Sequence, residues 1–240
     1  KFAEYLQQNN FIVVTFDYRG IGDSKTKHFR ATDIKKHEWG EKDINAVLLW
    51  IKKELNPPKI FVIGHSTGGT LTGLAPNHHL IDAMVTVGSQ NGYWQHWPFP
   101  QKYFYAVLWY LVMPSLAKLL GYFPAKRLGL GENLPQGVAL EWAKWCRNNN
   151  YLFCEDNENR KKQFANFTAP ILAYSFSDDH AAPKSATEWL IKQFPNSTIT
   201  YKYFTPQSLN VSSIGHFGLF KEKFKDFSKI LISSKLFSHL

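Results

Sequence analysis

Unbroken apolar runs alternate along the chain with segments in which apolar residues recur at helical spacing. Runs rich in β-branched and aromatic residues predict buried strands at residues 11–16, 59–63, 81–87, 171–176 and 199–204. Helical spacing separates them, most clearly over residues 41–55, where Pro57 and Pro58 should end the helix. Strands that alternate with helices predict an α/β fold, in which a mostly parallel sheet carries helices on both faces.

The interval between the third and fourth of these strands does not fit the alternation. Residues 89–168 separate two core strands where a connection of about 2–6 residues is usual. We therefore expect a core built from residues 1–88 and 169–240, with an inserted helical cap, or lid, over residues 89–168. Residues 93–145 hold 5 Trp, 5 Tyr and 3 Phe. These aromatics could line an apolar pocket under the lid, pack the lid onto the sheet, or bury a dimer contact.

A Gly-x-Ser-x-Gly pattern at residues 64–68 directly follows the predicted strand 59–63. A nucleophilic serine at a sharp strand-to-helix turn needs small residues two positions away on each side, and glycine occupies both. The alternative is an ordinary glycine-rich turn. Because the pattern lies between a strand and a helix, we predict Ser66 as a nucleophile.

A nucleophilic serine needs a base and an acid that orients the base, in the chain order Ser, Asp or Glu, His. Asp178 and Asp179 follow the predicted strand 171–176, and His216 lies in a glycine-flanked loop after the next strand. We predict His216 as the base and prefer Asp179 as the acid, with Asp178 as a cap or supporting residue.

These motifs resemble, in order and over nearly the whole chain, those of the α/β-hydrolase superfamily. The similar segments are 17–24 (DYRGIGDS), 64–69 (GHSTGG), 177–183 (SDDHAAP) and 214–217 (IGHF). In that superfamily a proline three or four positions after an acidic residue commonly marks the triad acid, which favours Asp179. Segments 92–94, 121–124 and 128–132 are similar to the insertion of bacterial predicted hydrolases of the serine-aminopeptidase-like (S33) type.

The resemblance also implies an oxyanion hole made of two backbone N–H groups. One belongs to the residue after the nucleophile, here Thr67. The other lies in a loop that should precede residues 2–6 and is absent from this sequence. We therefore expect the N-terminal strands of the sheet to be missing with it, and Lys1 not to be the natural start.

Charge and composition add little. The chain has 28 Lys+Arg and 19 Asp+Glu, a net charge of +9, but the cations are scattered, and we expect no nucleic-acid partner. The densest patch, Lys221, Lys223 and Lys225, is interleaved with acids. Residues 103–120 are the most apolar stretch, and because Pro114 interrupts them we expect no stable membrane insertion. Two cysteines match neither a disulfide scaffold nor a metal motif and indicate a reducing, cytoplasmic location.

The sequence thus predicts a serine hydrolase that cleaves a carboxylic ester or an amide through an acyl-enzyme, without metal or organic cofactor. Its partner would be a small, apolar acyl substrate; the oligomeric state stays open. An aminopeptidase-like enzyme or an acyltransferase with the same triad, and a non-catalytic binding protein on this scaffold, are the alternatives.

Overall fold

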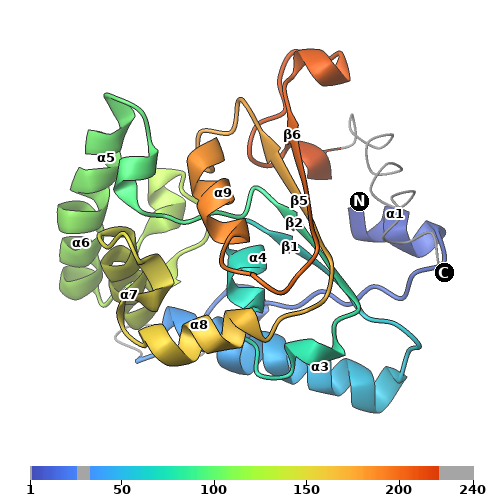
Figure 1. Ribbon diagram of the computed structural model, residues 1–240. Helices are drawn as coiled ribbons and strands as arrows, with labels where there is room; N and C mark the ends of the chain where they lie inside the picture. The colour runs from blue at the N-terminus through green and yellow to red at the C-terminus, as the bar shows by residue number, and fades with distance from the viewer. Residues whose placement is uncertain (1, 26–32, 222–240) are drawn as a thin grey trace.

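The structure is a computed structural model that describes residues 2–25 and 33–221 (Figure 1). A four-stranded sheet in the order β1-β2-β5-β6 forms its centre, and every pairing in it is parallel. The strands are β1 Phe61–His65, β2 Ala83–Val87, β5 Ile171–Phe176 and β6 Ile199–Phe204. All side chains of β2 and β5 are buried, as expected for central strands covered on both faces. The predicted α/β class is confirmed.

Helices cover both faces of the sheet. Figure 1 shows α3, α4 and α9 on one side and α1 on the other. The helices are α1 Phe2–Gln8, α2 Lys36–Glu38, α3 Asn45–Trp50, α4 Thr67–Thr72, α5 Gln101–Val107, α6 Met113–Leu120, α7 Gln136–Cys146, α8 Asn157–Ala165 and α9 Lys184–Ile191. The π-helical turn Trp39–Ile44 joins α2 to α3, and a second one, Ile51–Leu55, extends the same helical segment to Asn56, which has a φ of 40°. The predicted helix over residues 41–55 therefore exists and begins earlier.

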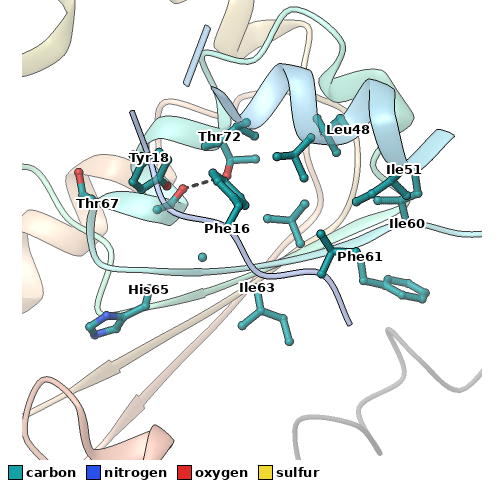
Figure 2. A pocket seen from close by; sticks show the side chains of 16 residues that line it. Phe16, Tyr18, Leu48, Ile51, Ile60, Phe61, Ile63, His65, Thr67 and Thr72 are labelled. Carbon is teal, nitrogen blue, oxygen red and sulfur yellow. Dashed lines mark hydrogen bonds between the residues drawn. The ribbon is translucent and has the colours of Figure 1, made fainter. Parts of the chain in front are cut away.

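The predicted strand at residues 11–16 is wrong. The structure gives these residues no regular secondary structure, and within the described residues β1 is an edge strand. A cavity of about 280 Å³ lies between the two segments, lined by Val14 and Phe16 on one side and by residues 60–65 on the other (Figure 2). Residues 11–16 have strand-forming side chains, but a strand also needs a hydrogen-bonded neighbour, and none of the described strands pairs with them.

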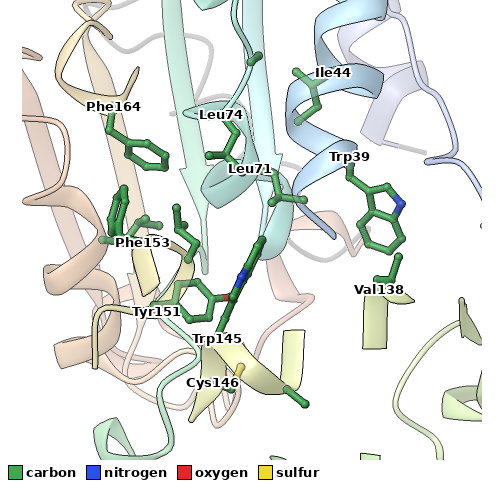
Figure 3. Packing of buried hydrophobic residues seen from close by; sticks show 14 of the residues in the cluster. Trp39, Ile44, Leu71, Leu74, Val138, Trp145, Cys146, Tyr151, Phe153 and Phe164 are labelled. Carbon is green, nitrogen blue, oxygen red and sulfur yellow. The ribbon is translucent and has the colours of Figure 1, made fainter. Parts of the chain in front are cut away.

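Residues 89–168 contain α5 to α8 and a short antiparallel pair, β3 Tyr122–Phe123 with β4 Leu134–Pro135. Their buried side chains belong to the same hydrophobic cluster as those of the sheet-covering helices. Figure 3 shows Trp145, Tyr151 and Phe153 packed towards Leu71 of α4. Part of the aromatic excess is therefore packing. The division into core and lid at residues 89 and 168 stays a prediction.

Pro114 does not interrupt the most apolar stretch, contrary to the expectation from sequence. Helix α5, the π-helical turn Leu108–Val112 and α6 form one helix over residues 101–120. A proline inside a helix lacks its N–H and clashes with the carbonyl four residues earlier, and a wider turn just before it relieves both problems. Gln101–Leu120 is the one helix among the described residues that is long and apolar enough to cross a membrane.

Lys36 of α2 is a buried lysine packed against two tryptophan rings. It is 1% exposed, and its ammonium group lies 5.1 Å from the ring centroid of Trp39 and 4.0 Å from that of Trp142 on α7. Burial lowers the pKa of Lys36 from 10.5 to about 7, while Cys146 and Glu141 oppose the shift. The folded protein therefore disfavours the charged form.

We expect Lys36→Met to stabilise the protein by about 2–3 kcal/mol at pH 6, because an isosteric apolar side chain removes the desolvation of the ammonium group. Between pH 7 and 10.5 the unfolded chain binds the extra proton, so wild-type stability rises with pH in this window. The advantage of the variant should shrink accordingly by pH 10. Urea unfolding at pH 6 and pH 10 measures both.

The matched control is Lys35→Met. The side chain of Lys35 is 42% exposed and pairs with Asp33 at the surface. Its replacement should change the free energy of unfolding by less than about 0.5 kcal/mol at either pH. A Lys36→Met protein that is no more stable than wild type at pH 6 would contradict the prediction.

Candidate active site

Ser66 occupies the turn between β1 and α4 in a strained conformation. Its φ is 52° and its ψ is −120°, a region that residues other than glycine rarely adopt. The Ser66 N–H donates to the Val87 carbonyl over 2.8 Å and so fixes the turn against the end of β2. Strain of this kind costs on the order of 1–3 kcal/mol and persists only where the surroundings impose it.

The glycines of the Gly-x-Ser-x-Gly pattern are not equivalent. A Cβ on Gly64 would lie 2.4 Å from the backbone nitrogen of Gly69, because strand and helix approach each other closely there. A Cβ on Gly69 would lie 2.3 Å from the Ser89 hydroxyl. A Cβ on Gly68 would meet only the Tyr18 hydroxyl, at 3.7 Å. The sharp turn therefore requires glycine at 64 and 69, whereas position 68 has room for a methyl group.

Asp179 and His216 form the central pair of the site. The Asp179 side chain is fully buried, and its Oδ2 lies 2.8 Å from Nδ1 of His216. Its other oxygen, Oδ1, accepts the backbone N–H groups of Ala181 and Ala182 at 2.9 and 3.0 Å. With Oδ1 held by the loop after β5, Oδ2 is directed at the imidazole. This arrangement favours an imidazole with a proton on Nδ1, which leaves Nε2 as the basic nitrogen.

The neighbouring Asp178 has different hydrogen-bond partners. Its Oδ2 accepts the N–H of Ile214 over 2.8 Å, and its Oδ1 accepts the N–H of Gly215 over 3.1 Å. Asp178 thus holds the backbone of the loop that carries His216 and does not contact the imidazole. The structure thus gives the two aspartates different partners, whereas their order in the chain does not distinguish them.

Gly88, which the sequence did not single out, lies where the Ser66 turn approaches the Asp179–His216 pair. It follows Val87, has a φ of 57°, and a Cβ on it would be 3.0 Å from Asp179 Oδ2 and 3.1 Å from His216 Nδ1. The three predicted residues therefore lie in the loops that follow the carboxyl ends of β1, β5 and β6, at the edge where α/β folds bind ligands. Within residues 2–25 and 33–221, no hydrogen bond joins the Ser66 hydroxyl to His216.

His65 supports His216 from behind, a role that the sequence did not reveal. Its Nε2 donates to the backbone carbonyl of His216 over 2.8 Å, and the two ring centroids are 4.5 Å apart. Burial, and then the nearby His216, lower the pKa of His65 to about 4. His65 is therefore neutral near pH 7 and adds no second positive charge when His216 takes up a proton. The rings of His65 and His216 meet only because the loop that carries His216 folds back onto the end of β1.

No metal or thiol site accompanies this cluster in the part of the chain that the structure describes. No group of three or more His, Cys, Asp or Glu side chains there is placed to hold a metal ion. Cys146 and Cys154 are free, and burial raises the pKa of both thiols. The predicted patch at Lys223 and Lys225 lies outside the described residues.

Comparisons with known proteins bear on the fold. A family model described as the alpha/beta hydrolase fold matches residues 1–106. A monoacylglycerol lipase from Paleococcus ferrophilus has a similar structure over 100% of this chain and 88% of its own, at 19% identity and a TM-score of 0.58. A hydrolase from Oleispira antarctica is similar over 98% and 85% of the two chains, at 18% identity and a TM-score of 0.56.

An esterase from Exiguobacterium antarcticum is similar over 90% of this chain and 78% of its own, at 17% identity and a TM-score of 0.52. No curated protein matches the chain. The fold is that of the α/β hydrolases. The family model covers residues 1–106 of the 240, and the similar structures show the fold. The similarity to the serine-aminopeptidase-like group stays a prediction.

Proposed function

We propose that the protein is a serine hydrolase that cleaves carboxylic esters with an apolar acyl group. The observation that carries the proposal is the strained Ser66, with φ of 52°, at the same edge of the sheet as an imidazole whose Nδ1 lies 2.8 Å from a buried carboxylate. A serine hydroxyl is a weak nucleophile unless a base removes its proton, and such a base needs an acid to fix its tautomer.

In the proposed reaction the Ser66 Oγ attacks the ester carbonyl carbon while Nε2 of His216 takes the hydroxyl proton. The Thr67 N–H donates to the oxygen that becomes negative. As the tetrahedral intermediate collapses, the imidazolium gives its proton to the departing alcohol and leaves an acyl group on Ser66. Water, deprotonated by the same imidazole, then releases the carboxylic acid.

The preference for esters rests on two observations. The similar structures include a monoacylglycerol lipase and an esterase. The stretch between β2 and β5, which leads away from the site, is rich in aromatic side chains that suit an apolar acyl chain.

The direct test is labelling by a fluorophosphonate, which reacts only with an activated serine hydroxyl. Wild-type protein should be labelled, and Ser66→Ala should lose the label. Thr205→Ala, which removes another hydroxyl from an exposed turn, is the control and should be labelled like wild type. A panel of nitrophenyl esters of increasing acyl length, beside aminoacyl anilides, then measures the substrate preference. Absent labelling, or equal labelling of Ser66→Ala, would refute the mechanism, and faster anilide cleavage would refute the ester preference.

A further inference from the structure

The outward side of the helix over residues 101–120 is apolar and uncovered. We call outer face the side chains of Tyr103, Phe104, Val107, Tyr110, Leu111 and Leu119, which are 52–80% exposed. Residues 103, 104, 107, 110 and 111 recur at helical spacing, and Leu119 lies about two turns further along the helix. Figure 1 shows α5 and α6 at the edge of the molecule, away from the sheet. Large exposed apolar patches mark surfaces that bind something.

The inner side of the same helix is already used. Leu108, Trp109, Met113 and Ala117 are at most 7% exposed and belong to the main hydrophobic cluster. The helix is therefore fixed to the protein along one side and cannot be surrounded by lipid without leaving that core. Its outer face can still lie flat against a surface.

The formal charges in the chain segment that carries the outer face are all positive. Residues 91–131 contain four cations, Lys102, Lys118, Lys126 and Arg127, and no Asp or Glu. Lys118 is exposed within the helix itself, next to Leu119. Glu132, just after this segment, pairs with Lys126. The segment itself contains no acid that could pair with Lys102, Lys118 or Arg127. A binding partner complementary to this face would have an anionic surface layer over an apolar interior.

We propose that the outer face docks the protein on an anionic lipid bilayer, with the helix lying in the headgroup region rather than crossing the membrane. A helix with tyrosine, phenylalanine and leucine on its exposed side and lysine at its margin has the composition of an interfacial helix. Tyrosine suits this depth because its ring is apolar and its hydroxyl reaches water. The docking involves no catalytic residue and stands apart from the proposed hydrolase activity.

The test is co-sedimentation of the protein with sucrose-loaded vesicles, without any ester substrate. We expect tighter binding to vesicles of phosphatidylcholine and phosphatidylglycerol (3:1) than to phosphatidylcholine alone. The double variant Phe104→Ser/Leu111→Ser should weaken binding to the mixed vesicles at least tenfold. Lys118→Glu should weaken it about fivefold or more and reduce its sensitivity to salt.

The matched control is Leu49→Ser/Trp50→Ser on α3, which removes two apolar side chains that are 46% and 48% exposed on another part of the surface. It should bind vesicles within twofold of wild type. Because the replaced side chains are exposed, thermal melts should show that all variants remain folded. Wild-type protein that ignores both vesicle types, or a Phe104→Ser/Leu111→Ser protein that binds like wild type, would overturn the proposal. If the outer-face variant instead turns a dimer into a monomer, the occupant is a second copy of this chain.

Discussion

Asp179→Asn is expected to lower kcat for the best ester about 10⁴-fold. The Asp179 carboxylate accepts the Nδ1 proton of His216 over 2.8 Å and so selects the tautomer whose Nε2 is basic. An asparagine that keeps its Oδ1 on the N–H groups of Ala181 and Ala182 would present its NH₂ group to Nδ1. The imidazole would then carry its proton on Nε2 and could not accept one from Ser66. Steady-state kinetics on a nitrophenyl ester measure the loss.

The neighbouring Asp178→Asn supplies the control, since it changes the same functional group one residue away. Asp178 accepts two backbone N–H groups from residues 214 and 215. The asparagine Oδ1 can keep one of these bonds, so the loop should hold and kcat should fall about tenfold or less. A larger loss in Asp178→Asn than in Asp179→Asn would reverse the two assignments.

Gly64→Ala is expected to destabilise the protein by about 3 kcal/mol, because the new methyl group would lie 2.4 Å from the backbone nitrogen of Gly69 and 2.5 Å from its Cα. Backbone atoms cannot move aside as a flexible side chain can, so β1 and α4 would have to separate. For a chain of this size the midpoint of thermal unfolding should fall by roughly 6–12 °C. Fluorophosphonate labelling at a temperature where the variant is folded should fall as well, because the turn sets the direction of the Ser66 hydroxyl.

Gly68→Ala tests whether the effect comes from the close approach or merely from losing a motif glycine. Position 68 lies in α4, and its Cβ would meet only the Tyr18 hydroxyl at 3.7 Å. Alanine also favours a helix over glycine, so the free energy of unfolding should stay within about 1 kcal/mol of wild type. Equal destabilisation by both alanines would show that the steric explanation is wrong.

The sequence predicted the parallel sheet because buried strands have a local signature. Strands β5 and β6 begin and end where their apolar runs do, β1 is shifted by two residues, and β2 begins two residues late but ends as predicted. Residues 11–16 carry the same signature and form no strand. Their failure shows that composition reports a preference for extended backbone, while a strand also needs a partner along its edge.

The candidate site was predictable in its residue types and chain order but not in its geometry. Asp178 and Asp179 follow the same strand, and only the direction of each carboxylate decides which one meets His216. The sequence around His65 does not indicate a contact with His216, yet the ring of His65 packs on that of His216. Such contacts depend on how a loop 151 residues later folds back, which local patterns do not encode.

The strained backbone of Ser66 also bears on why a serine, and not a glycine, occupies this position. At φ of 52° and ψ of −120°, a glycine would fit without the steric cost that serine bears. Random mutation filtered only for a well-folded product would therefore drift towards glycine at this position. Serine at this position makes the fold less stable than glycine would, and what it adds is a hydroxyl group. A serine at such a strained position is what the proposed nucleophilic role of its hydroxyl requires.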